Sequence, residues 1–228
     1  MNVTADADGL AELRRLGAGS VPVVSKGERF VYAQVIRDVA EFLDLGGAQG
    51  PELPPDALVA RGRLVLETAL RLAAQMPDAR LDDELPDRPR SWRVLMHHVF
   101  QIPTSFLEAE EHGGPLRYEV MVAEPPDTLR RSADIVRFGE GVARRFAQWW
   151  ERVREEPFDV TAAAYFGETT RHELLERTVW HMAQHVRQLA SLLERAGIAP
   201  DRPLGPEALQ GLPLSKAIWD EPSSGKQA

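Results

Sequence analysis

The residues of this chain best suited to chemistry are histidines, because four of its six histidines fall in two short clusters. One cluster is the pair His97–His98, and the other is His181 with His185 four residues later. On a helix, positions i and i+4 lie about 40° apart around the axis and one turn along it. The imidazoles of His181 and His185 can therefore approach one metal ion.

Neighbouring residues indicate which histidines face the interior. The face of His181 and His185 borders an apolar stripe, with Leu174, Thr178, Gln188 and Leu192. His98 lies on a face with Val94, Leu95, Ile102 and Ser105, and His97 points about 100° away from it. A metal ion bound by three imidazoles, those of His98, His181 and His185, would keep coordination positions open for water or substrate, as in catalytic zinc sites. Zinc is our first choice of metal, but nickel, iron or manganese also fits such a donor set.

Several observations favour a less specific reading. The HxxxH spacing also occurs by chance on helices that bind no metal. Met182 stands where a zincin would carry its glutamate base, so metal chemistry here needs another base or none. His112 and His172 lie near predicted helix ends, where we interpret them as solvated or capping residues.

Composition narrows the class of protein. The 228 residues include no cysteine, which excludes disulfides and thiolate catalysis and is typical of a reducing compartment. A net charge of −8 without a basic block argues against nucleic acid as a partner. The first residues resemble no signal peptide, and no apolar run approaches the ~18 residues of a membrane span. We expect a soluble cytoplasmic protein with no membrane partner.

Helical periodicity dominates the chain after a glycine- and proline-rich linker at residues 46–56. It predicts four long helices, at about 58–76, 90–112, 132–155 and 170–196. Pro77 ends the first, Gly197 ends the last, and Pro103 predicts a kink or a break in the second. Long connections follow the second and third helices, and the tail is expected to hold one short helix and a possible anchor, Trp219. We assign residues 54–228 to this helical domain.

Residues 1–46 read as a small α/β segment instead. A possible strand at 1–4 precedes a short helix at 10–16. Two strands, at 20–25 and 29–33, flank a turn at Lys26–Gly27, and a second helix spans 35–45. The segment is too short to be expected to fold without support from the rest of the chain.

The two histidine segments resemble a known family. Residues 91–99 (SWRVLMHHV) and 181–189 (HMAQHVRQL) are similar to the DinB/YfiT-like metal-binding proteins, which include mycothiol-dependent maleylpyruvate isomerase and bacillithiol transferases. The resemblance covers about residues 54–196. It implies a mainly α, up-down-down-up four-helix bundle and a divalent metal held by His98, His181 and His185. It further implies that Gln188 supports the ligands without binding the metal, and that the protein forms a homodimer.

Residues 16–24 (LGAGSVPVV), with Gly27 and the strand after it, resemble the C-terminal half of a glutaredoxin or thioredoxin fold. The resemblance implies a cis Val21–Pro22 bond. The first strand and the CxxC helix of that fold are missing, so this segment has no redox activity of its own. It is either a structural remnant packed on the bundle or a docking element for a thiol cofactor, and an N-terminally truncated chain is a third reading.

Taken together, these features predict a metal-dependent enzyme whose cofactors are a divalent metal and a low-molecular-weight thiol. The first hypothesis is a thiol-dependent S-transferase or isomerase acting on a small electrophile. Arginine far outnumbers lysine, which is found only at 26, 216 and 226, and this composition hints at a GC-rich genome and at mycothiol. A metal-dependent hydrolase and a non-catalytic metal-binding or stress-related module are the alternatives. The sequence assigns the three histidines as metal ligands and identifies no catalytic residue.

Overall fold

The computed structural model describes residues 7–19, 21–33, 36–44, 50–86 and 89–219. Within these residues the protein is mainly helical, with two small antiparallel sheets. The chain divides into two compact units between Gly50 and Pro51, inside the predicted linker. None of the described helices is both long enough and apolar enough to cross a membrane.

The second unit contains the four predicted long helices, each within a few residues of its expected bounds. They are α3 (Pro55–Gln75), α4 (Trp92–His112), α6 (Ser132–Val153) and α7 (Arg171–Arg195). Local signals set their ends: the Ser91 hydroxyl accepts the Val94 N–H at the start of α4, and Thr170 with Glu173 forms a capping box at the start of α7. Gly197 follows α7 with φ 75°, as predicted for a residue after a helix end.

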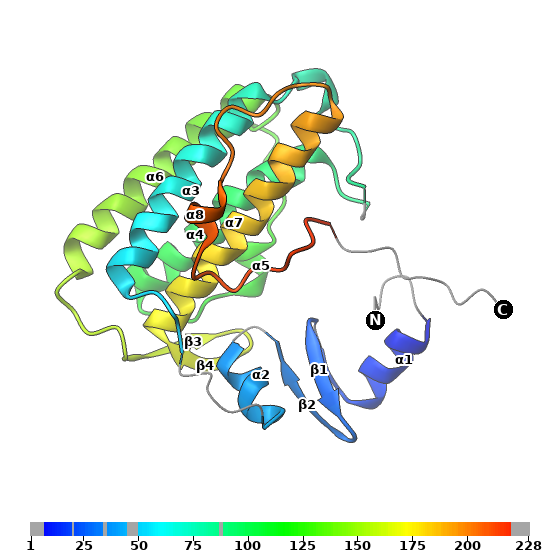
Figure 1. Cartoon of the computed structure of the whole chain (residues 1–228), viewed down its shortest axis with the longest axis vertical. Coiled ribbons are helices and arrows are strands. Elements are labelled where there is room, and N and C mark those ends of the chain that lie inside the picture. The colour runs from blue at the N-terminus through cyan, green and yellow to red at the C-terminus, as the bar shows by residue number, and fades with distance from the viewer. Residues whose placement is uncertain (1–6, 20, 34–35, 45–49, 87–88, 220–228) are drawn as a thin grey trace. The chain divides into compact units, whose positions relative to one another are not determined.

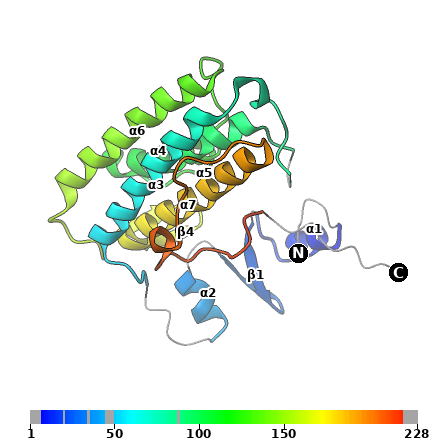
Figure 2. The ribbon, with the colours of Figure 1, turned by 45° about the horizontal axis from the view of Figure 1, so that its top comes forward.

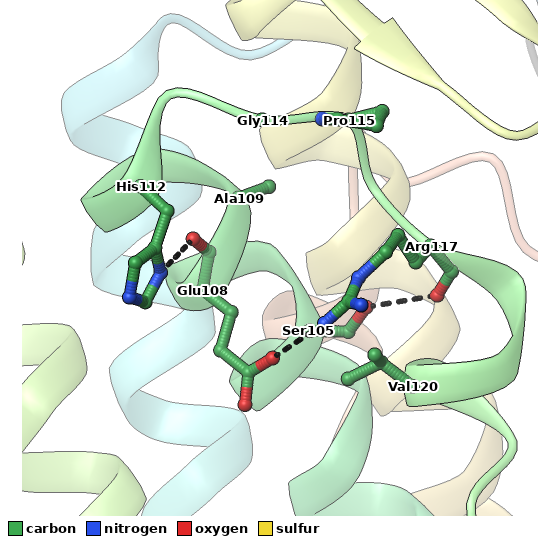
Figure 3. A pocket seen from close by; sticks show the side chains of 8 residues that line it. All are labelled: Ser105, Glu108, Ala109, His112, Gly114, Pro115, Arg117 and Val120. Carbon is green, nitrogen blue, oxygen red and sulfur yellow. Dashed lines mark hydrogen bonds and ion pairs between the residues drawn. The ribbon is translucent and has the colours of Figure 1, made fainter.

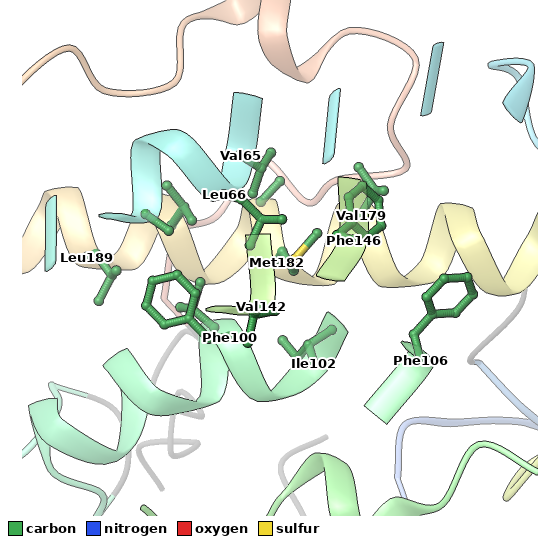
Figure 4. Packing of buried hydrophobic residues seen from close by; sticks show 14 of the residues in the cluster. Val65, Leu66, Phe100, Ile102, Phe106, Val142, Phe146, Val179, Met182 and Leu189 are labelled. Carbon is green, nitrogen blue, oxygen red and sulfur yellow. The ribbon is translucent and has the colours of Figure 1, made fainter. Parts of the chain in front are cut away.

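The long helices pack so that α3 contacts both α6 and α7, and α4 contacts the same two helices (Figures 1 and 2). Their apolar stripes meet in one core, in which each helix contributes fully buried side chains (Figure 4). Labelled examples are Leu66 from α3, Phe100 from α4, Phe146 from α6 and Met182 from α7. The amphipathic periodicity of the sequence is therefore explained by burial in this core.

Polar contacts join the ends of these helices. At the start of α6, the Ser132 hydroxyl lies 2.6 Å from the Met76 carbonyl, just after the end of α3. Near the end of α4, Glu110 accepts the indole N–H of Trp149, in the last turns of α6, at 2.9 Å. The same carboxylate is 3.2 Å from Arg171, the first residue of α7.

The two long connections hold short elements that the sequence analysis missed. After α4 comes a one-turn helix, α5 (Tyr118–Met121), and between α6 and α7 lies an antiparallel hairpin of β3 (Thr161–Ala164) and β4 (Gly167–Thr170). Each element is four residues long, too short for periodicity to indicate it. The tail carries α8 (Pro206–Leu209), the short helix that was expected.

Of the two outcomes expected at Pro103, the break is wrong, since α4 is a single helix from Trp92 to His112 with Pro103 inside it, and the kink stays a prediction. Proline removes one backbone hydrogen bond from a helix. The residues on both sides of Pro103, from Phe100 to Leu107, are all buried. Their tertiary packing outweighs the lost bond, so no break results.

The first unit consists of α1 (Ala7–Arg15), β1 (Val23–Lys26), β2 (Arg29–Tyr32) and α2 (Ile36–Phe42). The strands form an antiparallel hairpin whose turn holds Gly27 at φ 66°. Arg15 of α1 donates to the Gly27 carbonyl at 3.2 Å, and the Arg29 guanidinium lies 5.4 Å from the ring centre of Phe42. The Val21–Pro22 bond is cis, as predicted. The predicted strand at 1–4 lies outside the described residues.

Candidate metal centre

Three histidines from two helices converge inside the second unit. His98 comes from α4, and His181 and His185 come from α7. One ring nitrogen of each lies within 4.8 Å of those of the other two, and the ring centres are 4.9–5.4 Å apart. Tetrahedral zinc ligands at ~2.1 Å from the metal are about 3.4 Å apart. Small rotations of the rings would bring these nitrogens onto one ion.

His98 is held as a neutral donor. Its Nδ1 lies 3.0 Å from the Met121 carbonyl of α5, and a carbonyl can only accept, so Nδ1 carries the proton and Nε2 keeps a lone pair. Burial lowers the pKa of His98 well below its usual value, and repulsion from His185, when that ring is protonated, and from Arg90 lowers it further. A buried, neutral imidazole with an oriented tautomer is the form that binds metals.

His185 is oriented through a side chain. Its Nδ1 lies 2.7 Å from Oε1 of Gln188, while the Gln188 amide nitrogen donates to the Ile218 carbonyl at 3.0 Å. Gln188 thus contacts one candidate ligand through a hydrogen bond, and its role beside a metal stays a prediction of the resemblance. His181 and His185 are partly buried, whereas His98 is buried.

The remaining described histidines have other partners. The ring of His97 stacks on Phe138 at 5.2 Å, away from the cluster, and burial lowers its pKa to about 4. His112 bonds to the Glu108 carbonyl in the last turn of α4, and Nε2 of His172 lies 2.8 Å from the Leu53 carbonyl. Both residues are buried, His97 at 3% and His98 at 6% exposed, so the expectation that only His98 faces inward is wrong, but His98 is the one that joins the cluster.

A buried arginine close to the cluster escaped the sequence analysis. Arg177 precedes His181 by four residues on α7 and is 4% exposed. Its guanidinium donates to the Tyr165 hydroxyl at 2.9 Å, lies 3.7 Å from the Met121 sulfur and 5.2 Å from the ring centre of Phe166. The i, i+4 spacing to His181 was the available signal, but the hairpin that supplies the aromatic partners was not predicted.

The donor set consists of neutral groups. Among the described residues, no carboxylate belongs to the histidine cluster. Three neutral imidazoles would leave both charges of a divalent ion uncompensated. Such a centre favours anionic exogenous ligands, for example a thiolate or a hydroxide.

A cavity of about 200 Å³ lies elsewhere, beside the end of α4 and the start of α5 (Figure 3). Its charged side chains pair with each other, because Arg117 lies 3.6 Å from Glu108. Ser105 donates to the Arg117 carbonyl, and His112 bonds to the Glu108 carbonyl. None of the three clustered histidines lines this cavity, so we do not assign the chemistry to it.

A scan against protein-family models gives no match to this chain, and neither does a search of curated proteins. The family suggested by the histidine segments therefore stays a prediction.

Proposed function

We propose that this protein binds a divalent metal ion through His98, His181 and His185 and that it is an enzyme that uses a small thiol as a nucleophile. The observation that carries the proposal is the convergence of the three ring nitrogens within 4.8 Å. The reaction class is transfer of a thiol to a small electrophile, or thiol-dependent isomerisation. Zinc is the first choice of metal, with nickel, iron or manganese as alternatives.

We also propose membership in the DinB/YfiT-like group, with an up-down-down-up bundle. The contacts between helix ends support this topology. Ser132, at the start of α6, meets Met76 after the end of α3, and Glu110 near the end of α4 meets both Trp149 near the end of α6 and Arg171 at the start of α7. Helices α3 and α7 then run one way, and α4 and α6 the other. A homodimer is part of the same proposal.

When bound, the metal ion would supply Lewis-acid activation by lowering the pKa of a coordinated thiol or water. The protein's own groups would do the rest. The Met121 carbonyl and the Gln188 amide orient His98 and His185 so that Nε2 of each faces the centre. His181 and His185 are partly exposed, and an exogenous ligand would approach the ion beside them.

The ordinary pKa values of the two nucleophiles favour a thiol over water. A free thiol of pKa ~8.5 needs little activation, whereas water, with a pKa of ~15.7, needs much more and usually a general base as well. Hydrolysis is therefore the second candidate, and a non-catalytic metal-binding module is the third.

Metal analysis tests the first part of the proposal. We expect about one divalent ion per chain in the purified protein, and loss of most of it in His98→Ala, His181→Ala and His185→Ala. His97→Ala is the matched control, since it changes the adjacent residue in α4 and should keep the metal. Full occupancy in His181→Ala would rule out this centre.

The second part is tested with thiols. Cobalt-substituted protein should change its visible spectrum strongly with only one of mycothiol, bacillithiol and glutathione, and consumption of monochlorobimane should then exceed that with thiol alone. No spectral change and no rate enhancement would refute the transferase. Metal-dependent turnover of esters or amides without thiol would instead indicate a hydrolase. No activity in either assay would indicate a non-catalytic module.

A further inference from the structure

The C-terminal segment Ser215–Trp219, which we call the C-terminal strap, lies along α7 and is held there by side chains of that helix (Figures 1 and 2). Arg187 donates to the carbonyls of Ser215 and Lys216 at 2.7 and 3.0 Å. Gln184 donates to the Ile218 carbonyl at 2.9 Å. The strap is thus held through its backbone, which depends little on its own side chains.

Trp219 anchors the end of the strap. Its indole N–H donates to the Ser191 hydroxyl at 3.0 Å, and the Arg195 guanidinium lies 5.9 Å from the centre of its ring system. Its two partners, Ser191 and Arg195, lie six and ten residues beyond His185 on α7. This anchor therefore offers a way to loosen the strap without touching the candidate metal centre.

Gln188 connects the strap to the centre. Its amide nitrogen donates to the Ile218 carbonyl, and its amide oxygen lies 2.7 Å from Nδ1 of His185. The Ile218 carbonyl can only accept, so it requires the amide nitrogen of Gln188 on its side and the amide oxygen on the His185 side. Nδ1 of His185 must then carry the proton, and the lone pair falls on Nε2.

The two oriented ligands differ in how they are held. The backbone carbonyl of Met121 fixes His98 directly. His185 is fixed by the side-chain amide of Gln188, whose oxygen and nitrogen can exchange places by rotation because the two ends have nearly the same shape. If the strap leaves, the Ile218 carbonyl no longer holds the amide nitrogen of Gln188. The amide can then flip and present its nitrogen, a donor, to Nδ1 of His185. An Nδ1-protonated His185 would then lose its partner.

We propose that the C-terminal strap is a positioning element for the metal centre: through Gln188 it sets the tautomer of His185, so that metal binding and strap docking favour each other. The part that concerns metal affinity rests on the proposed function. The part that concerns the tautomer does not, because it follows from hydrogen bonds within the protein. Coupling of this kind is reciprocal by thermodynamic necessity.

The tautomer is measured first, by ¹⁵N imidazole spectra of the metal-free full-length protein. We expect His185 to be protonated on Nδ1 in the wild type and to become a mixture in Gln188→Leu, in Trp219→Ala and in Arg187→Met. Gln188→Glu should keep the Nδ1 proton, since a carboxylate accepts it in either orientation. An unchanged tautomer in both Gln188→Leu and Trp219→Ala would overturn the proposal, whether or not the protein binds metal.

Gln75→Leu is the matched control. Gln75 on α3 also holds the C-terminal region, donating to the Ala199 carbonyl at 3.0 Å and accepting the Asp201 N–H at 2.8 Å. It touches none of the three histidines. Removing its bonds should therefore leave the His185 tautomer and the metal affinity unchanged, and an effect as large as that of Gln188→Leu would mean that the tail acts only through general stability.

Metal affinity is measured next, by competition with a chelator for zinc. Loss of a group that orients a metal-binding histidine typically weakens affinity about 10- to 100-fold, and we expect this for Gln188→Leu and a smaller loss for Trp219→Ala. Adding Trp219→Ala to Gln188→Leu should leave the zinc affinity as low as in Gln188→Leu alone. Adding Trp219→Ala to Gln188→Glu should leave the zinc affinity near that of the wild type. Additive losses in these double variants would overturn the relay through Gln188.

The failure of this inference is distinguishable from the failure of the proposed function. Wild-type protein that binds no zinc refutes the metal centre and leaves the tautomer result to decide the positioning role. Wild-type protein that binds zinc with an affinity unaffected by Gln188→Leu refutes the coupling alone. By reciprocity, zinc should also slow hydrogen exchange or proteolysis in the strap of the wild type but not of Gln188→Leu.

Discussion

Substitution of Gly139 by alanine tests the close contact between α6 and α4. A Cβ atom at Gly139 would lie 2.6 Å from Cε1 and Cζ of Phe100. Phe100 is fully buried in the core, two residues after His98 in α4. Neither the ring nor the helix can move away without disturbing that core, so the alanine methyl group must be accommodated by strain.

The matched control is Gly141→Ala, two residues further along α6, where a Cβ atom would meet only the Arg144 side chain at 4.0 Å. Both substitutions gain the helix propensity of alanine over glycine, about 1 kcal/mol. Only Gly139→Ala overpacks the core, which costs about 1–3 kcal/mol. The difference between the two variants isolates this steric cost, because the propensity gain cancels.

Thermal and denaturant unfolding, followed by circular dichroism at 222 nm, measures that difference. For a chain of this size, 1 kcal/mol corresponds to roughly 2–4 °C in Tm, so Gly139→Ala should melt several degrees below Gly141→Ala. Phe100→Leu should cost less in the Gly139→Ala background than in the wild type, since the smaller side chain relieves the clash. Equal stability of the two alanine variants would refute the packing argument.

Two further predictions concern other parts of the helical unit. Burial raises the pKa of Glu176 to about 7 from 4.5, so the folded state keeps a proton that the unfolded chain releases, and this group lowers stability as pH rises from about 4.5 to 7. Glu176→Gln should therefore stabilise the protein by about 1–2 kcal/mol at pH 8 but not at pH 4. Denaturant titrations that give the same gain at both pH values would contradict this prediction. Ser132→Ala removes the hydroxyl that lies 2.6 Å from both the Met76 carbonyl and the Asp78 carboxylate. Urea unfolding should therefore show that the free energy of unfolding falls by about 1–2 kcal/mol, and a decrease below about 0.5 kcal/mol would show that this junction contributes little.

Much of the helical architecture could be predicted from the sequence alone, because its signals are local. Apolar periodicity located the four long helices, and Gly197 gave the end of the last one. Helical spacing placed His181 and His185 on one face, and it separated His98 from His97 by about 100° around the helix, although both are buried. Each of these inferences depends only on which residues lie within a few turns of one another.

Tertiary structure decided what depends on residues distant in sequence. The convergence of His98 with the α7 histidines requires α4 and α7 to pack with a particular register, which no local pattern specifies. The carbonyl that orients His98 comes from α5, and the one that orients Gln188 comes from the strap, and backbone groups leave no trace in residue type. The break expected at Pro103 was wrong for the same reason, since a core built by four helices, and not the local hydrogen bond, determines whether α4 continues.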